Sequence, residues 1–406
     1  MNKHLLFLFT VLLPLAASAH EFEVAGIYYN ITSEADKQVE VISGYTRYSG
    51  SITLPATVTH NGVDYSVTSI GEGAFFGCSS LTDITIPESV TSIGYGAFND
   101  CSSLTAITIP KSVTSIGEMA FNTCSNLISI VVAEGNKVYD SRNGCNAIIE
   151  TSSNTLIMGC AGTIIPEGVT SIGMMAFRYC SRLTAITIPE SVTEIGDAPF
   201  LNCSNLTAIV VAEGNKVYDS RGGCNAIIET SSNTLILGCA KTIIPESVTG
   251  IGNAAFFGYS SLTSITIPEG VTSIGESAFA YCSNLTAITF PESMTKIGVL
   301  AFCDCTHLST VTCLAVTPPT LDGPVTYTFR GVDKSIPVYV PTASVEDYKA
   351  AKHWNEFRNF IGVETGIENS EIRNENLRLI YDLSGRRVEK TEKGIYIVNG
   401  KKVVIK

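Results

Sequence analysis

One phrase returns eight times along this chain and decides what the chain can fold into. Its clearest copies read CSSLTDITIPESVTSIGYGAF from Cys78 and CSSLTAITIPKSVTSIGEMAF from Cys101. The cysteine position recurs at intervals of 23, 23, 56, 23, 56, 23 and 23 residues, with Tyr259 in its place in one copy. A fixed period in the twenties is typical of a solenoid, because one coil has no core of its own and stacked coils share one.

The copies share the consensus pattern L-x-x-I-x-I-P-x-x-V-x-x-I-G-x-x-A-F-x-x-C. In the second copy the alternation around Ile107 predicts a short strand, which Pro110 ends because proline cannot donate to a ladder. SVTSI predicts a second extended piece, and Gly117 predicts a positive φ or a close backbone approach. The Ala-Phe segment predicts a helical turn. The chain is therefore expected to form a mostly β solenoid of 23-residue coils with short helical turns.

The two intervals of 56 residues are themselves a repeat. VVAEGNKVYDSRNGCNAIIETSSNTLIMGCAGTIIPEGVTSIG at 131–173 returns, little changed, at 210–252. We expect one enlarged coil at 131–168 and another at 210–247, each containing a hairpin. If the hairpin turns at Ser152-Ser153, the opposed cysteines are disulfide candidates: Cys145 with Cys160, and Cys224 with Cys239.

The seven cysteines of the repeat phrase allow two interpretations. An exported chain with 13 cysteines is often held by disulfides. Residues at one position of a solenoid stack above one another, however, and Tyr259 shows that no bond is required there. We favour small, buried, apolar side chains. The seven are Cys78, Cys101, Cys124, Cys180, Cys203, Cys282 and Cys305.

Other segments divide the chain. Residues 1–19 predict a secretory signal peptide, with Lys3, an apolar run and Ala17-Ser18-Ala19 before the cut; a short membrane anchor is the alternative. An N-terminal β cap is expected at 20–66, the solenoid at 67–313 and a β/α C-terminal cap at 314–363. In that cap Thr342 or Ser344 would start a short helix, and Trp354 would seal the last coil. A polar linker at 364–376 precedes a small β tail at 377–406.

The repeat phrase resembles the leucine-rich repeats of BspA-type bacterial surface proteins, through its I-P, S-V-T-x-I-G and A-F-x-x-C elements. The resemblance covers about residues 22–362. It implies a curved, mostly β solenoid on a secreted or surface protein, with adhesion or protein binding rather than catalysis as its role.

The tail resembles the C-terminal sorting domains of type IX secretion cargo. The matching elements are residues 381–387 (YDLSGRR), Gly394-Ile395-Tyr396 and the last five residues, KVVIK. This implies display at the outer-membrane surface or release outside the cell. The alternative is a small β module that packs on the cap.

Composition and motifs point away from catalysis. The net charge is −12 with no basic stripe, which argues against nucleic acid as a partner. No metal-spaced pair, phosphate loop or nucleophile motif is found, so we expect no catalytic residue, no metal and no cofactor. The exposed positions of the repeat strand hold mostly threonine and alanine, which offer nothing for acid–base chemistry.

The positions beside Ala-Phe change from copy to copy, and several hold large side chains. Large apolar groups and arginine are typical anchors of protein interfaces, so these positions predict a binding stripe. The alternative is that they cover neighbouring coils. The stripe comprises Tyr95, Met119, Met174, Met175, Arg178, Tyr179, Leu201, Phe257 and Tyr281. We thus expect a monomeric, non-catalytic adhesion module for a host or neighbouring-cell protein or an extracellular glycan; the alternative is a spacer of the cell envelope.

Overall fold

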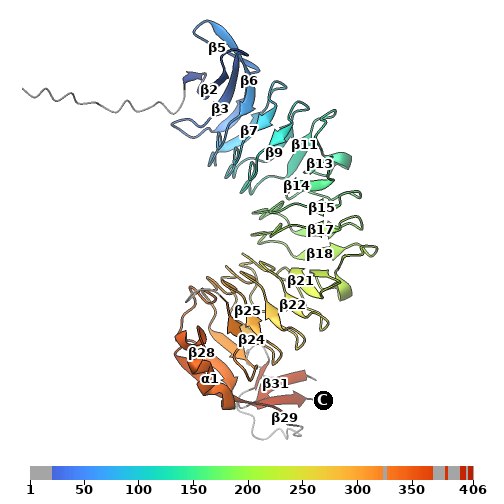
Figure 1. The fold of residues 1–406 in the computed structure, drawn as a ribbon, viewed down its shortest axis with the longest axis vertical. Helices are drawn as coiled ribbons and strands as arrows, with labels where there is room; N and C mark the ends of the chain where they lie inside the picture. Colours follow the sequence, from blue (N-terminus) through green and yellow to red (C-terminus); the bar gives the residue numbers. More distant parts are fainter. Residues whose placement is uncertain (1–20, 323–326, 369–379, 383–393, 399–400, 406) are drawn as a thin grey trace, which may run out of the picture.

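The computed structural model describes residues 21–322, 327–368, 380–382, 394–398 and 401–405. The predicted signal peptide at 1–19 lies outside these residues, as do parts of the predicted linker and tail. The chain is mostly β and stacks about 13 turns at a spacing of about 23 residues, as the repeat predicted. Figure 1 shows the coils following one another along a curved axis from the N-terminal strands to the C-terminal helix.

Two sides of most coils carry strands that pair in parallel with a neighbouring coil. The longer strand carries the I-x-I motif, and its two isoleucines point into the core. The longer strands are β4 (Gly50–Thr53), β7 (Leu81–Thr85), β9 (Ala106–Ile109), β11 (Ser129–Val132), β16 (Ala185–Ile188), β18 (Ala208–Val211), β24 (Ala287–Phe290) and β26 (Thr310–Cys313).

The shorter strand holds the isoleucine before the repeated glycine. These strands are β8 (Ser92–Ile93), β10 (Ser115–Ile116), β15 (Ser171–Ile172), β17 (Glu194–Ile195), β22 (Gly250–Ile251), β23 (Ser273–Ile274), β25 (Lys296–Ile297) and β27 (Thr320–Leu321). The glycine that follows is needed for close approach: a Cβ on Gly117 would lie 2.4 Å from the backbone nitrogen of Tyr95 in the preceding coil.

The third side is a run of tandem turns rather than a helical turn. In one coil Ala97, Asn99 and Cys101 donate backbone hydrogen bonds to residues three positions earlier, and Gly96, Phe98 and Asp100 donate to the next coil. Two residues of this run, four positions apart, have a positive φ: Gly96 (56°) and Asp100 (62°). Every second N–H points along the solenoid to the next coil, whereas the N–H groups of an α-helix bond within the helix.

Stacked phenylalanines and cysteines fill the core behind these turns. The rings of Phe75, Phe98 and Phe121 stack at 4.9 and 5.2 Å, and Phe256, Phe279 and Phe302 repeat the arrangement. Beside them five of the seven repeat thiols donate to a phenylalanine carbonyl of the preceding coil, as Cys101 Sγ does to Phe75 O at 3.1 Å, and Cys180 donates to Gly159 O instead. The prediction of small buried cysteines is confirmed for six of the seven; Cys180 is half-buried.

Each enlarged coil contains the predicted hairpin. The first comprises β12 (Tyr139–Asp140), a 3-10 turn (Arg142–Gly144), β13 (Ala147–Glu150) and β14 (Thr155–Gly159). The second comprises β19 (Tyr218–Asp219), a 3-10 turn (Arg221–Gly223), β20 (Ile227–Glu229) and β21 (Thr234–Leu237). In both, the hairpin is antiparallel and its last strand pairs in parallel with the short strand of the next coil.

The predicted register of these hairpins is wrong by one residue beyond the turn. Ile149 faces Leu156, but Ile148 faces Met158, so Ile157 is a bulge. The bulge places Cys160 against Asn146, whose carbonyl oxygen accepts from the Cys160 thiol at 3.3 Å. Cys239 lies against Asn225 in the same way. The structure therefore holds Cys145, Cys160, Cys224 and Cys239 as free thiols, not as the disulfides expected from an unbulged hairpin.

Both ends are covered. At the N-terminus β1 (Phe22–Val24), β2 (Ile27–Ser33), β3 (Gln38–Ile42), β5 (Thr57–His60) and β6 (Val63–Ile70) form the first strands of the short-strand sheet. A hairpin turn at Asn61-Gly62 joins β5 and β6, with both residues at positive φ.

At the C-terminus β28 (Pro337–Pro341), a 3-10 turn (Thr342–Ser344), α1 (Val345–Ala350) and a second 3-10 turn (Trp354–Glu356) close the last coil. Ser344 lies at the helix start as predicted, but its hydroxyl donates to Val316 O rather than capping the helix. Trp354 is fully buried and donates to Pro319 O at 2.9 Å, which agrees with its predicted sealing role.

The last coil continues into the tail. Strand β29 (Asn359–Glu368) pairs with β28 and with β32 (Lys401–Ile405), which pairs with β31 (Gly394–Val398) and then β30 (Ile380–Asp382). Residues 364–368, expected in the linker, therefore belong to a strand. Among the described residues, no helix is long and apolar enough to cross a membrane.

Candidate binding surface

The variable positions of the repeat all lie on one side of the solenoid, which we call the turn face. It consists of the tandem turns at 72–77, 95–100, 118–123, 174–179, 197–202, 253–258, 276–281 and 299–304. Every residue of the predicted stripe lies on it. Tyr95, Met174 and Tyr281 are exposed, and the other six are half-buried.

The structure gathers the stripe into clusters that bridge adjacent coils. Tyr95 donates through its hydroxyl to Met119 Sδ at 3.4 Å, and the rings of Phe257 and Tyr281 lie 5.2 Å apart. These contacts confirm in part the interpretation that such side chains cover neighbouring coils. Within these clusters Tyr95 and Tyr281 remain exposed and Phe257 is half-buried.

A third cluster lies next to the first enlarged coil. The Arg178 guanidinium lies 5.1 Å over the ring of Tyr179, and its Nη1 is 3.5 Å from Met175 Sδ. Arg178 Nε is buried and has no hydrogen-bond partner. Leu201 is tied to the cluster through its carbonyl oxygen, which accepts from the Tyr179 backbone at 2.9 Å.

Several of these side chains occupy strained backbone. Met119, Met175, Tyr179 and Tyr281 have φ between 55° and 60°. Other copies place glycine at the same positions, for example Gly73 and Gly96. A bulky residue with positive φ costs about 1 kcal/mol or more, and such strain gathers at binding sites.

Two hollows open on the turn face. One, of about 360 Å³, lies between the coils of Phe121 and Phe177 and is lined by Met119, Met174, Met175 and Arg178 among others. The other, of about 750 Å³, lies where the N-terminal strands meet the first coil and is lined by Tyr45, Arg47, Phe76 and Tyr95.

Two exposed aromatic residues of this second hollow were missed by the sequence reasoning. Phe76 occupies the same repeat position as Arg178 and is half exposed; Arg47 donates to its carbonyl and lies over its ring. The repeat position alone could have pointed to Phe76. Tyr45 comes from a loop outside the repeat, and only the fold brings it to the turn face.

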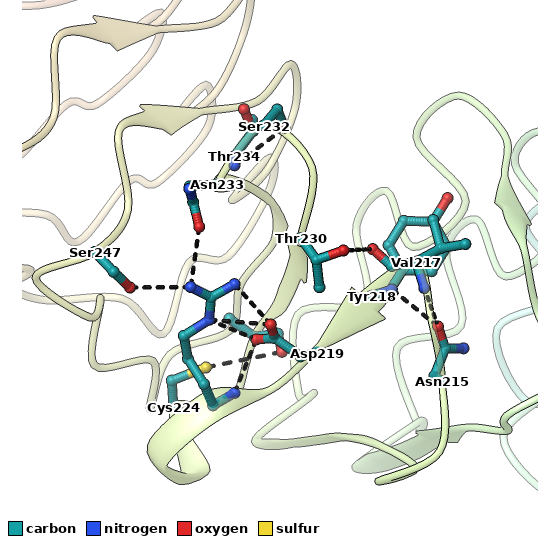
Figure 2. Close-up of polar contacts among 12 residues, drawn as sticks. Asn215, Val217, Tyr218, Asp219, Cys224, Thr230, Ser232, Asn233, Thr234 and Ser247 are labelled. Atoms are coloured by element: carbon teal, nitrogen blue, oxygen red, sulfur yellow. Dashed lines mark hydrogen bonds and ion pairs between the residues drawn. The ribbon is translucent and has the colours of Figure 1, made fainter.

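The enlarged coils contribute rigid polar frames rather than reactive groups. Figure 2 shows the second one, where Asp219 accepts from Arg221, and Asn233 and Ser247 accept from the same guanidinium. The paired Arg221 lowers the pKa of the Asp219 carboxyl against the opposing effect of burial. Asn215 accepts from two backbone N–H groups and donates to two carbonyls, so its amide is fully satisfied.

The remaining titratable groups do not converge. Cys303 lies against Asp304, Cys305 donates to Phe279 O, and His307 bonds Ser283 O. No group of three histidine, cysteine, aspartate or glutamate residues that could hold a metal ion is found within the described ranges. Burial raises the pKa of Cys303 to about 11 and those of Cys124 and Cys305 to about 12, so these thiols stay protonated near neutral pH.

Comparison with solved structures finds several repeat proteins. A leucine rich cell surface protein from Faecalibacterium prausnitzii is 24% identical, with 84% of this chain and 93% of that chain covered and a TM-score of 0.47. The pneumococcal vaccine antigen PcpA is 17% identical over 84% of this chain and 98% of its own, with a TM-score of 0.46. A leucine-rich repeat protein from Eubacterium ventriosum is 22% identical over 93% and 97%, also with a TM-score of 0.46.

No curated protein matches this chain. Among known families, the BspA type leucine rich repeat region matches residues 52–154, 159–221 and 236–322, in six copies. These segments cover more than half of the sequence and include the turn face; residues 155–158 and 222–235 of the enlarged coils lie outside them. The chain belongs to the BspA-type leucine-rich repeat family.

Proposed function

We propose that this chain is a secreted, cell-surface protein that binds another protein through its turn face and has no catalytic activity. Membership of the BspA-type family supports a binding or adhesion role at the cell surface. In this proposal residues 1–19 direct export, and the β tail at 377–406 is the sorting segment that brings the protein to the outer surface.

The observation that carries the proposal is the presence of large side chains at left-handed backbone positions of the turn face. Met119, Met175, Tyr179 and Tyr281 occupy positions where the fold itself would favour glycine. Their cost in stability is not offset by deep burial, because all four are half-buried or exposed. A role in contact with a partner accounts for them.

The chemistry of the turn face suits a protein partner. Tyrosine, methionine, phenylalanine and arginine are enriched at protein interfaces, where a few buried anchors supply most of the binding energy. By contrast, the exposed positions of the long strands hold mostly threonine, as Thr105 and Thr108 do. Threonine is a favourable residue on an exposed strand and needs no partner to explain it.

Glycine substitution tests the proposal without damaging the fold. The variant with Met119→Gly, Met175→Gly, Tyr179→Gly and Tyr281→Gly removes four side chains and relieves four strained positions. We expect it to keep the circular dichroism spectrum of the wild-type protein and to lose at least tenfold in affinity for any protein captured on an extracellular-matrix protein array.

A matched control changes the long-strand side. Val131→Thr and Val210→Thr replace two exposed valines with the residue that Thr108 and Thr187 supply one coil earlier. This variant should bind like wild type. Binding lost in the valine variant but kept in the glycine variant would place the interface on the strands and contradict the proposal. Binding only to a parallel glycan array, or to neither array, would support the glycan-binding or the spacer alternative instead.

A further inference from the structure

The two enlarged coils differ in how well the core continues through them. Buried side chains form one cluster from Phe22 to Cys160 and a second from Cys145 to Phe357. The division falls inside the first enlarged coil, where Tyr139 and Ile148 belong to one cluster and Ile149 to the other. The second enlarged coil lies wholly within one cluster.

One repeat position accounts for this difference. After the second enlarged coil, Tyr259 is 1% exposed and lies among the thiols of Cys203, Cys239 and Cys282. After the first enlarged coil, the same position holds Cys180, which lies among Cys124, Cys160 and Cys203. The smaller side chain leaves Cys180 as the one half-buried cysteine of the chain.

The seam beside this position is also closed only at the second enlarged coil. There the Asn202 backbone donates to Phe257 O at 3.4 Å, and Ser261 Oγ donates to Ser204 O at 3.0 Å. The corresponding pairs at the first enlarged coil are Thr123 with Arg178 and Ser125 with Arg182. Neither pair is hydrogen-bonded in the part of the chain that the structure describes.

The open seam holds the cavity of about 360 Å³ described above. Its wall includes Cys180, Phe121, Met119, Met158 and Met174, so its interior is mostly apolar and rich in methionine. A volume of this size suits a small ligand or one large side chain. Thioether sulfur makes favourable contacts with aromatic rings, and methionine side chains adapt to the shape of a guest.

Arg178 gives the cavity an unused hydrogen-bond donor. Its Nη1 has only the weak acceptor Met175 Sδ, and its Nε has no partner. Glu118 and Glu150 also line the cavity, and Glu150 already accepts from Ser153. Two carboxylates against one guanidinium do not favour an anion, so a neutral guest that carries an oxygen acceptor fits best.

The coil after the second enlarged coil shows what such a guest resembles. It holds an aromatic ring whose hydroxyl has no partner, Tyr259, and it has Phe257 at the repeat position of Arg178. The coil after the first enlarged coil has the donor but lacks the ring. We propose that the cavity between the coils of Phe121 and Phe177 binds a phenol ring, with Arg178 donating to the phenol oxygen.

The source we assign is a tyrosine side chain of the protein partner, which enters the cavity as an anchor of the interface. This part rests on the proposed function, whereas the binding of a phenol ring does not. An anchor of this kind would lie in the middle of the turn face, between the clusters of Tyr95 and Tyr281.

The probe is N-acetyl-tyrosinamide, compared with N-acetyl-phenylalaninamide, titrated into the full-length protein and followed by saturation-transfer NMR. We expect millimolar affinity for the tyrosine probe and about fivefold weaker binding of the phenylalanine probe, because one hydrogen bond is lost. Cys180→Tyr fills the cavity as Tyr259 does and should weaken both probes at least tenfold. Cys180→Ser keeps the cavity and should leave both unchanged.

Arg178→Leu removes the hydrogen-bond donor and keeps the cavity. It provides a second test if Cys180→Tyr does not fold. Leucine is the residue of the next coil at this position, Leu201. In this variant the two probes should bind equally. The proposal would be overturned if the probes bound wild type and Cys180→Tyr equally well. It would also be overturned if Arg178→Leu still bound the tyrosine probe more tightly than the phenylalanine probe.

The same variants separate the two proposals. If a captured protein loses affinity for the glycine variant but binds Cys180→Tyr like wild type, the tyrosine anchor is wrong and the proposed function stands. If it binds both variants like wild type, the proposed function itself is wrong. If the probes still bind with the expected preference, the phenol site remains.

Discussion

Tyr259 and Cys180 occupy the same position of the coils that follow the two enlarged coils, yet only Tyr259 is fully buried. The tyrosine ring fills the seam that the cysteine leaves open, but its hydroxyl has no partner. Packing and hydrogen bonding therefore have opposite effects on stability at this one residue.

Two substitutions at Tyr259 should change stability in opposite directions. Tyr259→Phe keeps the ring and removes the unpartnered hydroxyl, so we expect the free energy of unfolding to rise by about 1 kcal/mol. Tyr259→Cys opens a cavity like that beside Cys180 and should lower it by about 3 kcal/mol. Urea unfolding followed by the fluorescence of Trp354, the single tryptophan, reports both. A lower stability for Tyr259→Phe would show that the hydroxyl has a partner in solution.

Asn215 supports a second prediction, on the frame of the enlarged coil. Its side chain accepts from Val217 and Tyr218 and donates to Pro189 and Val192, all at 2.8–2.9 Å. Asn215→Ala removes four partly buried hydrogen bonds and should lower the free energy of unfolding by about 2–4 kcal/mol. The control, Asn205→Ala, removes one exposed bond to Ser181 and should cost less than about 1 kcal/mol. Similar losses of stability in the two variants would contradict the view that the four hydrogen bonds of Asn215 stabilise the enlarged coil.

How much of this could be predicted from sequence depends on whether a feature repeats. Phe121, Cys124 and Gly117 each recur in a fixed position, so their burial and close packing follow from the period. The hairpins also follow from their residues, but the bulge at Ile157 does not, and this one extra residue separates Cys145 from Cys160. A bulge depends on how β14 meets the next coil, which no local pattern records.

The candidate site divides in the same way. The variable positions identified Met175, Arg178 and Tyr281 as exposed to a partner or to a neighbouring coil. The cavity beside Arg178 arises because two coils are joined through an enlarged coil without a large residue at position 180. The two coils that form the cavity have equivalent positions 56 residues apart in the sequence, as Cys124 and Cys180 are. The shape of the cavity depends on how these coils pack, which the sequence pattern does not record.

The thiols make the folded protein sensitive to alkaline pH. Burial raises the pKa of the Cys124 and Cys305 thiols to about 12, from an ordinary value near 9. Below pH 9 both folded and unfolded chains keep these protons. As the pH rises above 9, the unfolded chain loses protons that the folded chain retains, so each such thiol lowers the free energy of unfolding by about 1.4 kcal/mol per pH unit.

Urea midpoints at pH 8, 9 and 10 measure this effect, and we expect a progressive fall above pH 9. A Cys124→Ala, Cys305→Ala variant, with two fewer buried thiols, should show a shallower fall. Constant stability from pH 8 to pH 10 would mean that the thiols are already ionised or oxidised in the folded protein.

The free state of all 13 cysteines is a further prediction. In denaturant, a thiol reagent should titrate 13 thiols per chain, because the bulged register keeps Cys145 from Cys160 and Cys224 from Cys239. In the native state the reaction should be slow at every repeat thiol, Cys180 included, because burial raises the pKa of the Cys180 thiol well above its ordinary value although its side chain is half-buried. Nine thiols in denaturant would indicate that both hairpins carry disulfides after all.

The division of the core at the first enlarged coil predicts two unfolding transitions. In a solenoid each coil is stabilised only by contacts with its neighbouring coils. Where the contacts between two coils are weak, the parts on either side can unfold separately. Trp354 lies in the C-terminal cluster and reports on that part alone, whereas far-UV circular dichroism reports on both. We therefore expect the circular dichroism curve in urea to show two steps, of which only one coincides with the Trp354 fluorescence. Cys180→Tyr should join the two clusters as Tyr259 does farther along, and its two curves should move together. Coincident single transitions in the wild-type protein would show that hydrogen bonds such as Gly159 N to Ala176 O couple the two parts despite the open seam.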